Sequence, residues 1–415
     1  MSRLFSTAIS SMQTQSLAMD VHANNIANVN TNGYKTVSAS FKTLFSESLR
    51  SARGASGGMA GLDPVEVGAG VRLGGTSTNY SQGSLTNTGE NLDLAILGDG
   101  FFMLRDADGN DFYTRDGSLG LDANGRLTHS ASGLAVQGLL VDPLTGTVPD
   151  GALPVDITIP PGMTLNAKAT GGATIAGNLD AGAVTGDSTQ MQFRYHDSFG
   201  VSHVMTVDFT KAAAANTWSW TASVGAPAVV VGSGNVVFNS TGDVLSGGSG
   251  TATVTVASGG VTAGGTDPSP VGLDFSTMTQ FADASEVEAT NQDGFPPGFL
   301  TDVVTDDVGN ISAVFSNGQT RPLAQLGIVN FANINGLSRK AENLFQQSAN
   351  SGSPQVVRAG SSGAGTIQSQ ALEMSNTDLA AELTQLIVLQ RGYQAATRMI
   401  TTADEMLQDA LSLKR

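Results

Sequence analysis

Both ends of the chain carry apolar side chains at helical spacing. Near the N-terminus, apolar or small positions recur at intervals of four and three residues: Phe5, Ile9, Met12, Ser16, Met19, Ala23 and Ile26. The same spacing recurs near the C-terminus at Leu379, Leu383, Leu386, Gln390, Tyr393, Thr397, Ile400, Asp404, Leu407 and Leu411. These heptad seams predict helices of about 25 residues and of more than about 30 residues. Asn376 or Thr377 is the expected cap of the second helix, and Gly392 should weaken it by about 1 kcal/mol.

A single amphipathic helix cannot bury its own apolar stripe. The two terminal helices are therefore expected to pack on each other, as a coiled coil or between subunits, which brings the ends of the chain together. The alternative is that they complete a globular core. The polar seam members Ser16, Gln390, Thr397 and Asp404 would weaken an isolated dimer and suit a crowded assembly of many subunits.

Between the helices, alternating apolar residues and glycine-rich turns predict short β-strands. Leu92, Leu94 and Ile96 alternate, and the segment 122–125, Asp-Ala-Asn-Gly, is typical of a hairpin turn. Trp218, Trp220, Ala222 and Val224 are expected to share one face of a strand. The predicted fold class is mixed: a terminal α-helical coiled coil with nested all-β domains, built as antiparallel sandwiches or barrels.

Charge separates one stretch from the rest. Residues 146–290 hold twelve acidic and three basic residues, so most of the net charge of −16 lies there. Gly- and Ser-rich connections flank the β region at 50–75 and 350–368. The expected domains are therefore nested: a helical domain at 1–30 with 372–415, an extended connecting region at 31–88 with 352–371, a first β domain at 89–148 with 276–351, and an inserted acidic β domain at 149–275.

Composition excludes several classes of protein. The 415 residues contain no Cys, so disulfide frameworks, thiolate chemistry and cysteine-ligated metals are ruled out. Twenty Lys and Arg against 36 Asp and Glu make a poor nucleic-acid binder. The apolar runs are too short to span a membrane, and no cleavable signal segment is visible.

The candidate chemical motifs have simpler structural explanations. Residues 54–58 match the nucleophile-elbow pattern but do not lie between a strand and a helix. Residues 106–111 resemble a calcium loop, with Gly109 at the wrong position. His196 and His203 flank a turn without further ligands. We therefore expect no catalytic residues, no cofactor and no metal, and a structural or binding role.

Three long motifs resemble the axial proteins of the bacterial flagellum, the rod and hook proteins. The first is NNIANVNTNGYK, which comprises Asn24, Asn25, Ile26, Ala27, Asn28, Asn30, Thr31, Gly33, Tyr34 and Lys35. The second is LDLAILGDGFFMLRD at 92–106, and the third is the run 375–415. The extra β domain near 146–275 and the segment 279–300 are similar to those of hook proteins, because rod proteins are much shorter.

The resemblance implies a structural subunit that polymerises into a curved, flexible helical tube, joins rod to filament and transmits torque for motility. It implies partners as well: further copies of the chain, the rod, the hook cap, the hook-length control and hook–filament junction proteins, and the flagellar type III export apparatus. The expected location is the hook and basal body, outside the cell after export without a cleaved signal. A distal-rod protein with an inserted domain, or a secreted Gly-rich adhesin, are the alternatives.

Two hypotheses assign different roles to the terminal helices and to the inserted domain of such a subunit. The predicted seams, Phe5 to Ile26 and Leu379 to Leu411, would make the permanent inner contacts, so that Leu386→Asp with Ile400→Asp should abolish polymers. The acidic inserted domain would make weak outer contacts that slide as the tube bends.

Overall fold

The computed structural model describes residues 2–52, 54, 63–142, 145–149, 151–257, 260–261, 268–361 and 363–412. The chain divides into two compact units. The first unit comprises residues 1–161, 303–313 and 321–415, and the second comprises 162–302 and 314–320. Residues 55–58 of the nucleophile-elbow pattern lie outside the described residues.

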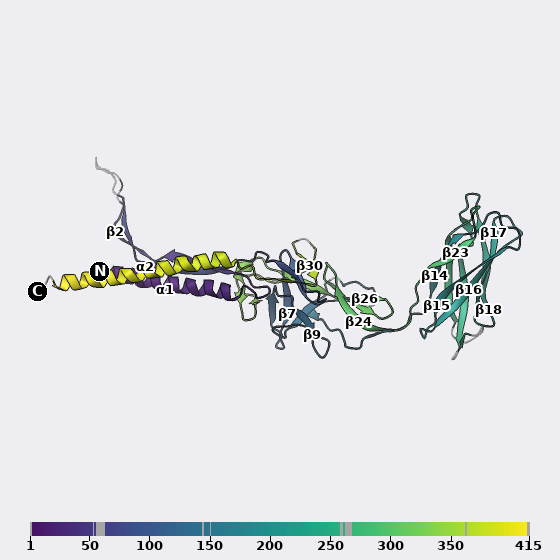
Figure 1. The fold of residues 1–415 in the computed structure, drawn as a ribbon, viewed down its shortest axis with the longest axis horizontal. Coiled ribbons are helices and arrows are strands. Elements are labelled where there is room, and N and C mark those ends of the chain that lie inside the picture. The colour runs from purple at the N-terminus through teal and green to yellow at the C-terminus, as the bar shows by residue number, and fades with distance from the viewer. Residues whose placement is uncertain are drawn as a thin grey trace. The chain divides into compact units, whose positions relative to one another are not determined.

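The terminal helices lie side by side in the first unit (Figure 1). Helix α1 (Ser2–Ala27) has 26 residues and α2 (Leu379–Ser412) has 34, which confirms both predicted helices. The predicted cap of α2 is wrong. Asp378 caps this helix, because its Oδ1 accepts the backbone N–H groups of Ala380 and Ala381 at 2.9 and 3.2 Å.

Short paired strands connect the helices to the rest of the first unit. All of these pairs are antiparallel. They are β1 (Val37–Thr43) with β4 (Val71–Thr78), β2 (Ser46–Arg50) with β3 (Val65–Gly68), β5 (Leu85–Asn87) with β31 (Ala371–Glu373), and β6 (Leu94–Leu97) with β30 (Thr366–Ser369). Because β5 and β6 pair with β31 and β30, the segment after α1 and the segment before α2 are held together.

The main sheet of the first unit follows the order β26-β11-β7-β8-β28-β27. Its strands are β7 (Phe101–Arg105), β8 (Asp111–Thr114), β11 (Ala135–Leu140), β26 (Thr320–Asn330), β27 (Ser338–Arg339) and β28 (Leu344–Gln346). Smaller elements attached to it are β9 (Leu119–Leu121), β10 (Leu127–His129), β12 (Val155–Asp156), β29 (Gln355–Arg358) and the 3₁₀ turn η1 (Ile334–Gly336). An aromatic core of Phe101, Tyr113, Phe331 and Phe345 packs on this sheet.

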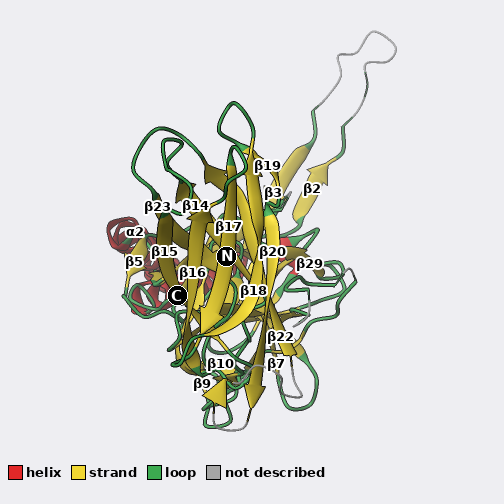
Figure 2. Cartoon of the chain, turned by 90° about the vertical axis from the view of Figure 1, so that its right-hand side faces the viewer, coloured by secondary structure: helices red, strands yellow, loops and turns green. Residues whose placement is uncertain are grey.

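The second unit is a β-sandwich of two five-stranded sheets in the described residues (Figure 2). One sheet has the order β21-β20-β22-β14-β23, with β14 (Gly172–Asn178), β20 (Ser249–Ala257), β21 (Gly260–Val261), β22 (Pro268–Thr279) and β23 (Glu286–Gln292). The other has the order β15-β16-β17-β18-β19, with β15 (Ser188–His196), β16 (Ser202–Lys211), β17 (Thr217–Val224), β18 (Val229–Phe238) and β19 (Val244–Ser246). Also in this unit, β13 (Thr164–Leu165) pairs with β24 (Gly298–Thr305); β24 and β25 (Asn310–Phe315) have residues in both units.

Alternation of side chains builds the core of this sandwich. Every second residue of β17, from Trp218 to Val224, is buried, as its sequence predicts. Phe275 from the facing sheet packs against Trp220 and Phe209, with ring centroids 5.3 and 5.7 Å apart. The mixed fold class is thus confirmed, with one difference in detail: β14 and β22 run parallel.

The second unit continues past the expected end of the inserted domain. We expected residues 276–351 in the first β domain, whereas β14 pairs on one side with β22, which ends at Thr279, and on the other with β23 at 286–292. Main-chain pairing therefore draws residues 276–302 into the second unit, although the acidic composition alone suggested an earlier boundary.

Candidate functional site

The two terminal helices contact each other, and each carries a row of half-buried side chains. The rows repeat every seven residues and comprise Phe5, Met12, Met19 and Ile26 on α1, and Leu386, Tyr393, Ile400 and Leu407 on α2. All eight belong to the predicted seams. That they make the assembly contacts stays a prediction.

The predicted seams contain a second row of positions on each helix, and this row is more exposed. Its members Ile9, Leu383 and Leu411 are 46%, 44% and 69% exposed. Leu379, which precedes Leu386 by seven residues in the first row, is also exposed, at 43%. The less exposed positions are instead Ala8, Gln15 and His22 on α1 and Glu382, Leu389, Ala396 and Ala403 on α2. All of these except Leu389 are small or polar. Small residues allow the helices to approach closely; a Cβ at Gly392 would lie 2.7 Å from Gln15 Oε1.

Polar contacts join the two helices near the β region. His22 Nδ1 lies 2.5 Å from Glu382 Oε2, and Asn25 Nδ2 donates to Glu382 Oε1 at 3.1 Å. These side chains are within two turns of the end of α1 and one turn of the start of α2. They fix the register of the pair where both helices meet the β strands.

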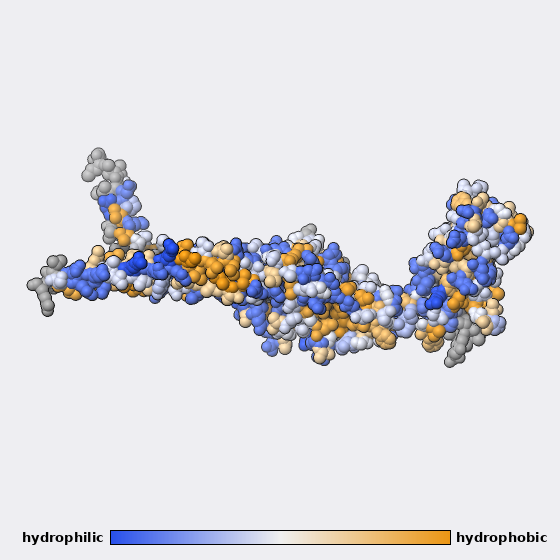
Figure 3. Space-filling view, in the orientation of Figure 1, coloured by the Kyte–Doolittle hydropathy of each residue, from blue (hydrophilic) through white to orange (hydrophobic). Residues whose placement is uncertain are grey.

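The opposite side of α2 exposes apolar side chains. Ile387 is 51% exposed and follows Leu379 and Leu383 at four-residue intervals on the N-terminal half of the helix, and Val388, 58% exposed, lies on another side of the same turn. Figure 3 shows this apolar surface over the helix pair close to the β region. On α1, Leu4, Ile9 and Leu17 are also about half exposed. Exposed apolar side chains gathered on one element are typical of a protein–protein interface.

The asparagine-rich motif at 24–35 lies at the junction between α1 and the β strands that follow it. Asn25 is fully buried, and its amide donates to the Val37 carbonyl at 2.8 Å while its Oδ1 accepts from Tyr34 Oη and the Val37 N–H, both at 3.0 Å. Burial raises the pKa of Tyr34, and the Arg339 guanidinium lies 4.3 Å from its ring centroid. Ile26 is on the helix-pair face. Asn25 thus ties α1 to the first strand that follows it.

Lys35 ends the motif in a buried ion cluster. Its Nζ lies 2.6 Å from Glu373 Oε1, and Arg115 Nη1 lies 3.7 Å from Glu373 Oε2; the side chains of Lys35 and Glu373 are 0% exposed and that of Arg115 is 3% exposed. The Gly83 N–H also donates to Glu373 Oε1, at 2.8 Å. Burial lowers the pKa of Lys35 and that of Arg115. One carboxylate therefore holds together the segments after α1, before α2 and in the β region.

The remaining motif residues shape the turn between α1 and β1. Asn28 donates to the Asn24 carbonyl at 2.8 Å, and Thr31 donates to Asn28 Oδ1 at 3.1 Å. Ala27 ends α1, and Asn30 is exposed. Gly33 has a φ of +64° and its N–H donates to the Glu373 carbonyl at 2.7 Å.

Replacing Gly33 with alanine should destabilise the first unit by about 2 kcal/mol or more, because a left-handed non-glycine residue costs about 1–3 kcal/mol and the new Cβ would lie 2.6 Å from the Asp116 backbone nitrogen. Urea unfolding of the monomer measures this. Gly89→Ala is the matched control, since Gly89 has a φ of +77° but open space around its Cβ position. Equal losses in the two variants would contradict the steric part of the argument.

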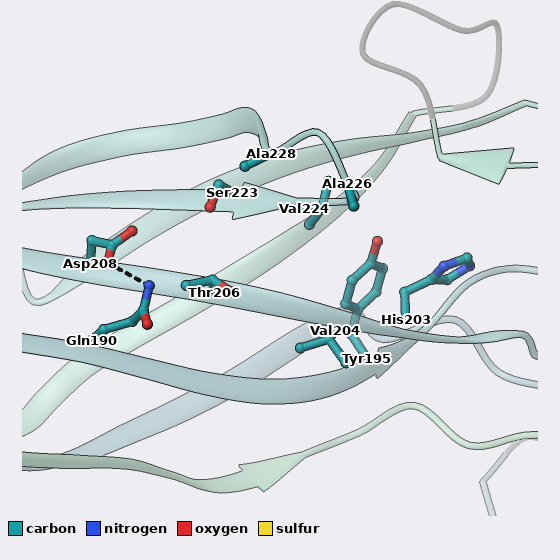
Figure 4. Close-up of a pocket in the computed structure, with 11 residues that line it drawn as sticks. Gln190, Tyr195, His203, Val204, Thr206, Asp208, Ser223, Val224, Ala226 and Ala228 are labelled. Atoms are coloured by element: carbon teal, nitrogen blue, oxygen red, sulfur yellow. Dashed lines mark hydrogen bonds between the residues drawn. The ribbon is translucent and has the colours of Figure 1, made fainter.

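A groove in the second unit is lined by residues of β15–β17, among them Gln190, Tyr195, His203 and Asp208 (Figure 4). These groups interact with protein neighbours. Gln190 donates to Asp208 at 3.0 Å, and the His203 ring stacks on Tyr195 while its Nε2 lies 2.8 Å from Asp197 Oδ2. Burial raises the pKa of Tyr195 to about 12. The arrangement supports the turn between β15 and β16.

Asp197 makes this turn sensitive to acid. Burial opposes ionisation of Asp197, but hydrogen bonds from His203, Val201 and Phe199 outweigh it and hold the pKa below the ordinary value of 3.8. The stabilisation is therefore present above the unfolded value and lost as pH falls through the folded value. Wild type and Asp197→Asn should differ more in urea resistance at pH 7 than at acid pH, read by the fluorescence of Trp218 and Trp220. A difference that does not shrink in acid would contradict this assignment.

The described residues contain no group of three or more His, Cys, Asp or Glu side chains arranged to hold a metal ion. Within the same residues, no helix has the length and apolar character needed to cross a membrane. The features that stand out are the exposed helix face and the buried junction behind it, which suit assembly better than chemistry.

Known families match most of the chain. Residues 5–35 match "Flagella basal body rod protein", 95–175 "Flagellar hook protein FlgE/F/G D1 domain", 164–295 "Flagellar basal body protein FlaE D2 domain", and 368–413 "Flagellar basal body rod FlgEFG protein C-terminal". The first and last matches contain the helix pair, and the FlaE D2 match falls within the second unit.

Full-length relatives agree with these matches. The flagellar hook protein FlgE of Treponema pallidum is 34% identical over 471 residues, covering 100% of both chains. That of Escherichia coli is 34% identical, covering 99% of this chain and 100% of its own. The fold is similar to the flagellar hook protein FlgE2 of Helicobacter pylori, with a TM-score of 0.51 and 16% identity over 70% of this chain and 100% of that one. The chain belongs to the flagellar hook protein family, whose members are structural subunits of the flagellar hook and not enzymes.

Proposed function

We propose that the exposed face of the helix pair forms the inner wall of the hook by packing against further copies of the chain. The observation that carries this is the set of exposed apolar side chains on the N-terminal half of α2, including Leu383, Ile387 and Val388. A contact between different faces of successive copies does not close on itself and produces a helical tube. The predicted positions Ile9, Leu379, Leu383 and Leu411 would then lie between subunits, and the half-buried row within one subunit.

The second unit would supply weaker outer contacts. Its stretch of the chain carries much of the negative charge, and like charges on neighbouring copies disfavour tight packing. Contacts of this kind can slide as the tube bends, which suits a joint that joins rod to filament and transmits torque. The nested order of helical, connecting and β domains would then run from the inside of the tube to the outside.

The remaining partners follow from the same role. The ends of the tube would contact the rod, the hook cap and the hook–filament junction proteins, and its growth would involve a hook-length control protein. The chain would leave the cell through the flagellar type III export apparatus without a cleaved signal. The absence of Cys from all 415 residues suits passage as an uncross-linked chain.

Polymerisation of a face variant tests the proposal. Ile387→Asp with Val388→Asp should leave the monomer folded, because both side chains are more than half exposed, and should abolish tubes seen by electron microscopy. Wild type under the same conditions should give curved tubes.

The matched control is Phe199→Asp with Val201→Asp, which places two aspartates at positions 72% and 53% exposed in the second unit. This control should polymerise. If the α2 variant forms tubes at the wild-type concentration, the inner wall is not made by this face. Straight wild-type tubes would contradict the proposed role as a curved, bending joint.

A further inference from the structure

The outward side of α2 changes character along its length. Beyond the apolar surface at Ile387 and Val388 lie Arg391 and Arg398, which border a shallow groove together with Gln394 and Thr402. Glu405 and Asp409 follow towards the C-terminus. Figure 3 shows the hydrophilic surface that succeeds the apolar one along the helix pair.

These four charged residues lie on one stripe of the helix. Positions 391, 398 and 405 are seven residues apart and 409 is four further on, spacings that return to the same helix face. All four side chains are exposed. Within the part of the chain that the structure describes, none of them makes an ion pair with another residue. Two turns separate Arg398 from Glu405, which is too far for a direct bond within the helix.

We propose that Arg391 and Arg398 bind the Glu405 and Asp409 carboxylates of α2 in a second copy of the chain. This inference rests on the proposed function and adds the contact that sets the stagger between copies. Parallel helices shifted so that the basic pair faces the acidic pair are offset by about 12.5 residues, or about 19 Å. At this contact the stripe is basic on one copy and acidic on the other.

Charge complementarity selects a second copy as the occupant. The apolar surface supplies the contact area but allows several alignments, whereas oppositely charged pairs favour one register and oppose others. Unshifted parallel helices would bring Arg391 against Arg391 and Glu405 against Glu405, and like charges placed opposite each other are disfavoured. The shifted alignment removes both repulsions.

A charge-exchange experiment tests the contact. Arg391→Glu with Arg398→Glu, and separately Glu405→Arg with Asp409→Arg, should each reduce the amount of pelleted polymer at least tenfold. The variant with all four changes should recover polymerisation, because every contact is again between opposite charges. An equimolar mixture of the two double variants should also polymerise, although neither does so alone.

The control for net charge is Arg72→Glu with Arg194→Glu, two exposed residues that belong to strands and not to α2, which should polymerise like wild type. Far-ultraviolet circular dichroism confirms that each variant keeps its helices. The inference is overturned if the double variants polymerise like this control, or if the fourfold variant stays monomeric with wild-type helicity. Failure of wild type itself to form tubes would instead refute the proposed function.

Discussion

Replacement of Glu373 by alanine is expected to lower the free energy of unfolding of the first unit by about 3–5 kcal/mol, the usual cost of removing one partner of a buried ion pair. Glu373 is the only carboxylate within 4 Å of Lys35 or Arg115 in the described residues. Its loss leaves two buried cations without a counter-charge. Urea unfolding of the monomer, followed by far-ultraviolet circular dichroism, measures the change.

The matched variant is Lys35→Met, which removes one cation and fills most of its volume. It should cost less than Glu373→Ala, because Arg115 still neutralises the carboxylate at 3.7 Å. Combining Lys35→Met with Glu373→Ala should cost less than the sum of the two, since the double variant leaves a single buried cation. Simple additivity would show that the three side chains do not act as one cluster.

Phe275→Ala should destabilise the second unit by about 3–5 kcal/mol, the range for truncating a fully buried phenylalanine. Phe275 is 0% exposed, and its ring contacts Phe209 and Trp220 across the sandwich. Both tryptophans, Trp218 and Trp220, belong to this unit. Fluorescence therefore reports unfolding of the second unit alone, while circular dichroism of the helices reports the first.

Phe299→Ala is the control, because Phe299 is 67% exposed in the same unit, and it should cost less than about 1 kcal/mol. Because the helix pair lies in the other unit, Phe275→Ala should leave the helical transition and polymer yield near wild type. Loss of tubes in this variant at a temperature where the second unit is still folded would contradict the division of labour proposed above.

The sequence predicted the terminal helices well because their signals are local. The spacing of Phe5, Met12, Met19 and Ile26 reports helical periodicity whatever the partner is. It could not decide which neighbouring row faces the partner, since Ile9 and Leu383 are more apolar than Gln15 and Glu382. The contacts of His22 and Asn25 with Glu382 on the other helix explain why these polar side chains are not exposed.

The junction was predicted only in part, for a different reason. The asparagine-rich motif stands out in the sequence, and the structure places it in the turn after α1. The contact between Lys35 and Glu373 joins residues 338 positions apart, and no local pattern reports such a pair. Lys35 is visible in the sequence as the end of the motif, but its burial, which requires a carboxylate nearby, is known only from the structure.

Main-chain pairing also limited the prediction of the inserted unit. Composition marks where the acidic stretch begins and fades, but sheet membership depends on hydrogen bonds between distant strands. Val287 and Ala289 alternate with Glu286 and Glu288, which is typical of a strand yet says nothing about its neighbour. The pairing of β23 with β14 decides it.

The contact of Gly392 with Gln15 has a mechanical consequence. Sliding α2 by one turn along α1 would bring Val388 or Ala396 opposite Gln15, so that the Gln15 side chain would have to move. The same slip would break the contacts of His22 and Asn25 with Glu382. Axial slip between the two helices of one subunit is therefore opposed. In the proposed tube, changes of length would accordingly take place between helix pairs and not within one.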